Sequence, residues 1–178
     1  MEAEAAARPP VARPLERQVI LAGVDPGKSG AIVRFGGDYS PFVHMMPVIT
    51  GAKRDEFDAP LIVKMLDGCS HVFVEKLQPM PLKAGGSIAN FNRGFCNGLF
   101  IGLLTALSIP FTMVRPQEWQ KEMLAGIPGE DTKQRSVMAA QRLFPTVSLL
   151  PTPRCKKPSD GIADALLIAE WGRRRLGR

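Results

Sequence analysis

Two short apolar runs that each end in an acidic residue place the strongest constraint on this chain. Residues 19–25 and 72–75 are apolar up to a final Asp25 and a final Glu75. Runs of this kind are typical of strands that are buried in a sheet. A carboxylate in such a place needs a partner or a metal, because an isolated buried charge is costly. The chain therefore predicts a sheet with oxygen ligands at the ends of two strands.

A second pair of acids stands near the C-terminus. Asp160 and Asp164 are one helical turn apart, so that both lie on one face of a predicted helix. If the two acidic strands are neighbours, four carboxylates meet, and they repel one another unless cations lie between them. Hard oxygen ligands of this kind suit Mg²⁺ or Mn²⁺. We expect the metal ligands and catalytic acids to be Asp25, Glu75, Asp160 and Asp164.

The length and composition indicate one catalytic domain. The chain has 178 residues, of which 45% are hydrophobic, which is enough for one full core. We expect the domain at residues 18–178, and a disordered leader or the remnant of a targeting segment at residues 1–17. The longest apolar stretch, at residues 99–107, is too short to span a membrane. Three widely spaced cysteines argue against a disulfide framework and against structural zinc.

The net charge points to a phosphate-rich partner. The formal charge is +6, and seven lysines or arginines stand against three acids from Thr152 onward. We expect this end of the molecule to lie near phosphates. The alternative is a solvated basic helix.

The hydrophobic pattern predicts an α/β fold. A hairpin with its turn at residues 26–30 comes first, and a strand that follows a helical crossover is expected to pair in parallel. The predicted strands are residues 18–25, 31–35, 41–46, 71–75 and 111–114. The predicted helices are residues 57–66, 87–108, 116–124 and 132–144, and one that Ser159 caps. This order predicts a mixed five-stranded sheet flanked by helices, as in the ribonuclease H-like fold.

A carboxylate cluster with two ions about 4 Å apart can hydrolyse a phosphodiester, leaving a 5′-phosphate and a 3′-hydroxyl. Lys133, at the start of a predicted helix, is placed to approach the scissile phosphate or the attacking water, or is an ordinary surface charge. Each acid also has a plain structural interpretation. Asp25 can cap the turn that follows it, Asp160 can favour a helix N-terminus, and Glu75 can pair with Lys76 or Arg115.

A competing motif lies in the first turn. Residues 22–29 fit the loose phosphate-loop pattern A-x-x-x-x-G-K-S, in which Lys28 would bind phosphate. Such a loop must lead directly into a helix. Residues 30–37 instead contain a β-branched pair, Ile32 and Val33, and end in two glycines, which leaves no room for a helix of useful length. A nucleotide hydrolase and a non-catalytic nucleic-acid-binding module remain as the alternatives to a metal-dependent nuclease.

Three motifs together resemble the RuvC-like Holliday junction resolvases, and among them the chloroplast group. They are residues 23–31, residues 74–75 and residues 160–166, within a similarity that runs from about residue 19 to residue 172. The resemblance implies a ribonuclease H-like fold and a homodimer that makes paired symmetric nicks in four-way junction DNA. It also implies Mg²⁺ or Mn²⁺, two per active site, and a place in the chloroplast nucleoid.

The resemblance also assigns roles to residues. Asp25, Glu75 and Asp164 occupy matching motif positions, and Lys133 looks like the basic residue that such enzymes bring to the active site. Asp160 stands one position before the usual companion acid or histidine, where this chain has a glycine, but it can still share the face of Asp164.

Residues 81–93 occupy the place at which these resolvases meet the centre of the junction. Glycines there allow a close approach to DNA, amides can read base edges, and basic side chains can hold phosphate. The alternative is that this helix packs a dimer, for which the apolar residues 95–107 offer a surface. The predicted DNA contacts are Lys28, Lys83, Gly85, Gly86, Ser87, Asn90 and Arg93.

Overall fold

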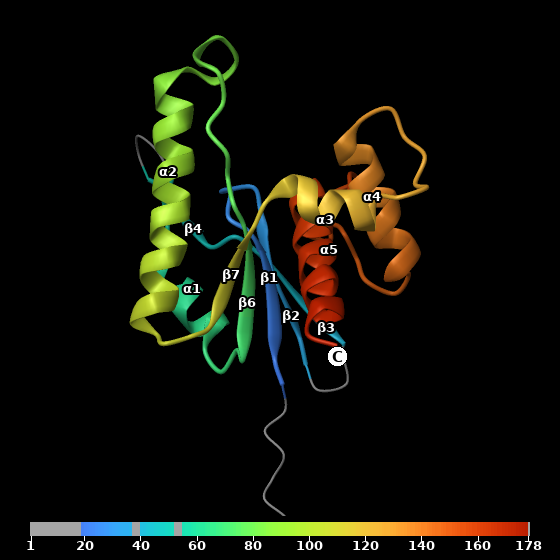
Figure 1. Cartoon of the computed structure of the whole chain (residues 1–178), viewed down its shortest axis with the longest axis horizontal. Coiled ribbons are helices and arrows are strands. Elements are labelled where there is room, and N and C mark those ends of the chain that lie inside the picture. Colours follow the sequence, from blue (N-terminus) through green and yellow to red (C-terminus); the bar gives the residue numbers. More distant parts are fainter. Residues whose placement is uncertain (1–18, 37–39, 52–54, 178) are drawn as a thin grey trace, which may run out of the picture.

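The computed structural model describes residues 19–36, 40–51 and 55–177. The leader predicted at residues 1–17 lies outside this part of the chain. A central sheet carries helices on both faces, as Figure 1 shows. No helix among the described residues combines the length and the apolar character that a membrane span requires.

The central sheet is mixed and has five strands in the order β3-β2-β1-β6-β7. β1 pairs antiparallel with β2 and parallel with β6, and β6 pairs parallel with β7. The five strands are β1 (Leu21–Asp25), β2 (Ala31–Phe35), β3 (Pro41–Met45), β6 (His71–Glu75) and β7 (Phe111–Val114). The predicted sheet is confirmed, including the adjacency of the two strands that end in acids.

Helices cover both faces of this sheet (Figure 1). One face carries α1 (Ala59–Leu66) and α2 (Leu82–Ala106). The other face carries α3 (Pro116–Met123), α4 (Thr132–Leu143) and α5 (Asp160–Arg175). Each face has its own apolar core, so the sheet is buried on both sides.

The alternation of side chains along the strands decides which residues meet α5. Val24 and Val74 belong to the core under α1 and α2, whereas Phe73 belongs to the core under α5. Side chains two positions apart in a strand point to the same face. Asp25 and Glu75 therefore lie on the α5 face, at the carboxyl ends of β1 and β6.

The first helix begins later than predicted. Phe57 was expected in a helix, but it pairs with Val48 in a separate two-stranded sheet of β4 (Val48–Ile49) and β5 (Glu56–Phe57). Asp58 caps α1 instead, and its side chain accepts a hydrogen bond from the Leu61 amide at 3.0 Å. The prediction that the helix begins at Phe57 was wrong, because the apolar spacing continues across Asp58, the residue that caps the helix.

The second helix begins earlier than predicted. Residues 77–86 were expected to form a loop, but α2 starts at Leu82. The backbone is non-helical at Gly86, where φ is +66° and ψ is 173°, and glycine adopts this conformation without steric cost. A short helical turn therefore precedes the predicted break, and the long helix continues from Ser87.

The close packing of α5 on β1 depends on a missing side chain. A Cβ atom at Gly23 would lie 2.3 Å from the carbonyl oxygen of Ala165 and 2.4 Å from the amide nitrogen of Ala169. Both are backbone atoms of α5, so they cannot rotate away. At the other end of the helix, a Cβ atom at Gly172 would lie 2.1 Å from the ring of Phe73. These glycines bring α5 against the sheet at contact distance.

We expect Gly23→Ala to lower the free energy of unfolding by about 3 kcal/mol, because α5 must move away from β1 to make room for the methyl group. Gly98→Ala is the matched control, since a Cβ atom on this exposed turn of α2 meets nothing within 4 Å. That change should raise the free energy of unfolding by about 0.5–1 kcal/mol. Urea denaturation measures both values. Equal stability of the Gly23→Ala and wild-type proteins would contradict the packing described here.

Candidate active site

The register of the sheet brings two of the predicted acids side by side. β1 and β6 are parallel, and Val24 pairs with Val74. Asp25 and Glu75 come next on the two strands, at the same edge and on the same face. Burial, together with the neighbouring Asp25 carboxylate, raises the pKa of Glu75 to about 7. The two strands that end in acids are therefore neighbours, as the prediction of a shared site required.

The third acid reaches this edge from the helix that crosses the sheet. Burial raises the pKa of Asp164, on α5, to about 8, and the charges of Asp25 and Glu75 add to this rise. The nearby hydroxyl of Ser136 opposes this rise in the pKa. Its Oγ makes no hydrogen bond, however, and the buried Asp164 Oδ1 accepts none. A buried carboxylate oxygen without a donor is suited to a cation.

Asp160 occupies a different environment from the other three acids. Its Oδ2 atom lies 2.6 Å from Lys133 Nζ, and both side chains are exposed to solvent. The hydrogen bond from Lys133 lowers the pKa of Asp160, and the pKa of Lys133 is raised in turn. The charge of Asp160 still acts on Asp25 and Asp164. The structure thus brings Lys133 to the edge of the carboxylate cluster.

The structure explains why position 161 is a glycine. A Cβ atom at Gly161 would lie 2.5 Å from the carbonyl oxygen of Ser29, 2.7 Å from the Cα of Gly30 and 3.1 Å from Asp25 Oδ2. The first turn of α5 touches the β1–β2 turn beside the Asp25 carboxylate, so position 161 has no room for a side chain. The acid of this turn is Asp160, one residue earlier, whose exposed side chain contacts Lys133.

Sequence reasoning missed one residue of this site. Trp119 of α3 is fully buried, and its indole Nε1 donates a hydrogen bond of 3.0 Å to Glu75 Oε1. The sequence suggested Lys76 or Arg115 as the partner of Glu75. In the structure, the hydrogen bond to Glu75 comes from this indole. The apolar spacing of α3 marks Trp119 as a core residue, and no local signal in the sequence links it to Glu75.

The plain structural interpretation of Asp25 holds in part. Its Oδ1 accepts a hydrogen bond from the Gly27 amide at 3.3 Å. Burial nevertheless raises the pKa of Asp25 to about 6. The competing phosphate-loop interpretation does not fit, because the turn leads into strand β2 and no helix follows it. Lys28 donates to the carbonyl oxygen of Asp55 and lies over the Phe57 ring.

The donor set of this edge fits hard divalent cations. Asp25, Glu75 and Asp164 are carboxylates whose ionised forms are disfavoured by burial and by one another, and a bound cation would offset both effects. As the side chains of the described residues stand, no three potential ligands are placed to hold one ion. Cation binding at this edge stays a prediction, with these acids as the residues that would provide the ligands.

Two asparagines of α2 fasten the segment that follows Glu75. The Asn90 side chain accepts from the Met80 amide and donates to the Met80 carbonyl, both at 2.8 Å. Asn97 does the same with Leu77, at 3.1 and 2.9 Å. The amide of Asn90, predicted to read base edges, is therefore engaged with the backbone of its own chain in this conformation.

The other predicted DNA contacts lie at the start of α2 and beside it. Lys83 and Ser87 are exposed, Gly85 lies in the short helical turn between them, and the backbone departs from the helix at Gly86. Arg93 donates to the Gln78 carbonyl at 3.4 Å, and its charge lowers the pKa of Glu75 against the dominant effect of burial. This end of α2 stands beyond the edge of the sheet at which β1 and β6 end (Figure 1).

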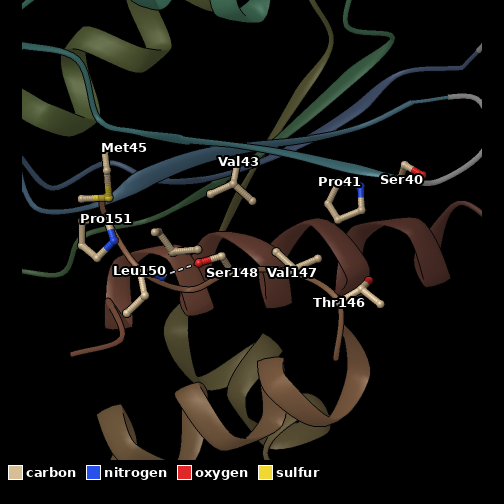
Figure 2. A pocket seen from close by; sticks show the side chains of 10 residues that line it. Ser40, Pro41, Val43, Met45, Thr146, Val147, Ser148, Leu150 and Pro151 are labelled. Atoms are coloured by element: carbon tan, nitrogen blue, oxygen red, sulfur yellow. Dashed lines mark hydrogen bonds between the residues drawn. The ribbon is translucent and has the colours of Figure 1, made fainter. Parts of the chain in front are cut away.

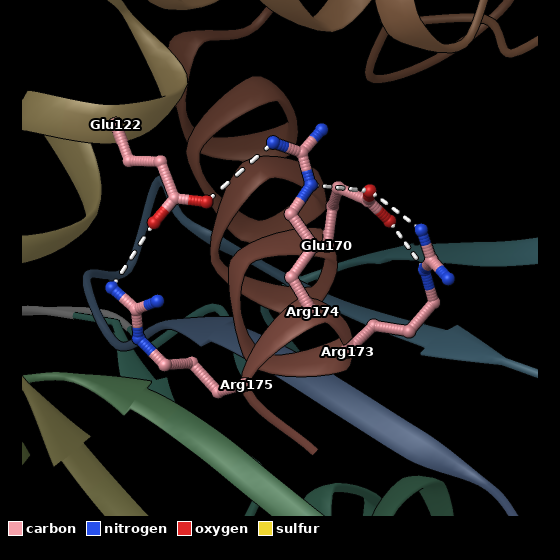
Figure 3. Close-up of polar contacts among 5 residues, drawn as sticks. All are labelled: Glu122, Glu170, Arg173, Arg174 and Arg175. Atoms are coloured by element: carbon pink, nitrogen blue, oxygen red, sulfur yellow. Dashed lines mark hydrogen bonds and ion pairs between the residues drawn. The ribbon is translucent and has the colours of Figure 1, made fainter. Parts of the chain in front are cut away.

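Three arginines at the basic C-terminal end form ion pairs within the chain. Arg173 and Arg174 bind the carboxylate of Glu170, and Arg174 and Arg175 bind Glu122 of α3, as Figure 3 shows. These arginines are about 20 Å along α5 from the acidic edge. Arg174 and Arg175 join α5 to α3, and all three arginines complement the C-terminal end of the helix dipole. Proximity of this basic end to phosphates stays a prediction.

One hollow of the described surface lies away from the acids. It has a volume of about 480 Å³ and lies between edge strand β3 and residues 146–151 (Figure 2). Its lining includes Val43, Met45 and Leu150, and none of the four predicted acids. A second hollow, of about 370 Å³, is bordered by Lys133 and Asp160 and adjoins the carboxylate cluster.

The fold and the acidic edge define a class of protein: the sheet and its helices have the ribonuclease H-like fold of RuvC-type resolvases. Thermus thermophilus RuvC, solved in complex with a Holliday junction substrate, superposes with a TM-score of 0.54 at 16% identity, over 89% of this chain and 96% of that chain. The yeast mitochondrial Holliday junction resolvase Ydc2 gives a TM-score of 0.51 at 14% identity, over 90% of this chain and 80% of that chain.

A particular relative is similar in sequence. Over 93 residues, or 52% of this chain, it is 34% identical to the chloroplastic Holliday junction resolvase MOC1 of Chlamydomonas reinhardtii. The matched segment spans 10% of the length of that relative. No protein-family model matches the chain. The resemblance to RuvC-like resolvases that the motifs indicated is confirmed.

The raised pKa values predict how stability depends on pH in a metal chelator. The folded protein holds protons on Asp25, Glu75 and Asp164 up to about pH 6, 7 and 8 respectively. The unfolded chain releases them near pH 4. The folded state therefore binds more protons between pH 4 and 8, and its stability falls as pH rises through this window. Each such group contributes a slope of up to about 1.4 kcal/mol per pH unit.

Urea denaturation in chelator from pH 5 to 8 measures this slope. Asp164→Asn should flatten it, because the amide does not titrate. The lowered pKa values of Asp160 and Glu170 act below this range. Burial also lowers the pKa of His71, which opposes the slope within the range but involves one proton against three. Stability that is constant or that rises with pH would contradict the described environment of the three carboxyls.

Proposed function

We propose that this protein is a metal-dependent DNA endonuclease that resolves Holliday junctions by paired, symmetric phosphodiester hydrolysis. The observation that carries this proposal is the meeting of Asp25, Glu75 and Asp164 at one edge of a ribonuclease H-like sheet. The similarity to MOC1, itself named a Holliday junction resolvase, supports the choice of substrate.

Each residue of the cluster has a role in this reaction. Asp25, Glu75 and Asp164 would hold the cations, with Asp160 at the margin. Bound Mg²⁺ or Mn²⁺, two per active site, supplies activation of the attacking water and stabilisation of the leaving 3′ oxygen. Lys133, held by Asp160, brings a positive charge beside the scissile phosphate.

The DNA would lie across the acidic edge and the start of α2. Lys83 and Ser87 are exposed there to contact phosphates, and Gly86 lets the backbone approach closely. Arg93 stands between this segment and Glu75. Lys28 lies in the turn that follows Asp25. A DNA phosphate there would compete with the carbonyl oxygen of Asp55 for the ammonium group of Lys28.

The proposed enzyme is a homodimer of the chloroplast nucleoid. Two symmetric cuts in a four-way junction require two active sites about a two-fold axis. An exposed apolar face on α2 offers a surface for this pairing, with Ile88 and Phe91 exposed by 78% and 70%. The chloroplastic relative supports the location.

Cleavage of a synthetic four-way junction tests the proposed activity. With Mg²⁺ we expect paired nicks in opposite strands of the junction, no cutting of a plain duplex, and no cutting in chelator. Asp25→Asn should reduce cleavage by at least about 100-fold while junction affinity is kept, because the ligand is lost and the phosphate contacts remain. A gel-shift titration measures that affinity. Retained cleavage by Asp25→Asn would refute the proposal, and cutting of duplex and junction alike would refute the junction selectivity.

Sedimentation measures the proposed dimer. The wild-type protein should sediment as a dimer, and Phe91→Glu should shift it toward monomer, because a charge on the apolar face of α2 must be desolvated on pairing. Phe42→Glu is the matched control, since Phe42 is 60% exposed on β3, away from α2. A monomeric wild-type protein at the concentrations that resolve junctions would contradict the dimer.

A further inference from the structure

Trp119 forms a direct link between the buried core and the candidate active site. It lies on α3 and is 0% exposed, so its indole is fixed by the surrounding side chains. Nε1 donates to Glu75 Oε1 at 3.0 Å. Among the described residues, no hydrogen bond reaches Glu75 Oε2. One carboxylate oxygen is therefore occupied by a neutral donor, and the carboxylate as a whole lies near enough to Asp25 for their charges to interact.

The helix that carries Trp119 is held at both ends. At its start, the Arg115 amide donates to the Glu118 side chain at 3.1 Å. At its end, Glu122 binds Arg174 at 3.5 Å and Arg175 at 3.0 Å (Figure 3). These ion pairs attach α3 to α5, the helix that carries Asp164. The indole therefore has a fixed position relative to both the sheet and α5.

A flexible glutamate at a strand end must lose rotamer freedom before it can serve as a ligand. A donor that holds one of its oxygens removes that freedom in advance, and donors of this kind orient metal ligands in many proteins. We propose that Trp119 is a positioning residue, which fixes the side chain of Glu75 so that Oε2 faces the cation site. This inference rests on the proposed function, because it assumes that Glu75 is a ligand.

The second tryptophan provides a matched comparison. Trp171 is only 7% exposed, yet its Nε1 has no hydrogen-bond partner in the described structure. The chain contains two tryptophans in all. Each can be changed to phenylalanine, which keeps an aromatic ring and removes a buried indole N–H. Only the change at Trp119 removes a hydrogen bond to Glu75.

Mn²⁺ binding measured by calorimetry tests the inference. Trp119→Phe should weaken Mn²⁺ affinity by about 10- to 100-fold, the usual effect of losing a group that orients a ligand. Trp171→Phe should bind Mn²⁺ as the wild type does. Equal affinities for the two variants would overturn the role of Trp119.

A spectroscopic measurement covers the case in which Trp119→Phe does not fold. In Trp171→Phe, Trp119 is the one remaining indole, and its emission reports on the carboxylate that it contacts. Mg²⁺ should change this emission, and the added change Glu75→Gln should abolish the response. An emission that does not respond to Mg²⁺ concentrations that support cleavage would overturn the inference.

The outcomes separate the two claims. If the wild-type protein neither binds Mn²⁺ nor cuts the junction, the proposed function and the role of Trp119 both fail. If it does both, and Trp119→Phe matches Trp171→Phe in Mn²⁺ affinity and in cleavage, the proposed function stands and only the role of Trp119 fails.

Discussion

The contact between α5 and β1 is the constraint on which the candidate site depends. Backbone atoms of the helix approach the strand so closely that no side chain fits at Gly23, and the first turn of the helix touches the β1–β2 turn at Gly161. Asp164 stands between these two contacts along the helix. The same packing that buries the core therefore delivers the third carboxylate to the two strand ends, Asp25 and Glu75.

This packing stabilises the fold but disfavours the ionised form of the three carboxyls. Burial and mutual repulsion raise the pKa values of Asp25, Glu75 and Asp164. The apolar packing on both faces of the sheet offsets that cost, as is usual where a functional site is built into a stable core. A cation at the acidic edge would recover part of this energy, and the paired Lys133 and Asp160 remain charged at its margin.

The sequence predicted most of the sheet and the adjacency of Asp25 and Glu75, because strand alternation is local and a strand that follows a helical crossover usually pairs in parallel. It did not predict Trp119 as a partner of Glu75, since that contact joins distant segments and follows only from how α3 packs. The sequence shows an acid at position 160 but not why position 161 is a glycine. The reason is the close contact of Gly161 with the β1–β2 turn. The charge count at the C-terminus did not reveal that Arg174 and Arg175 pair with Glu122 of α3, because that contact also joins distant segments.

A crystal structure with Mn²⁺ tests the central claim most directly. The anomalous signal of manganese should give density between the carboxylates of Asp25, Glu75 and Asp164, with Glu75 still bonded to Trp119. Density confined to other surface sites, or three side chains turned away from one another at saturating Mn²⁺, would contradict the account.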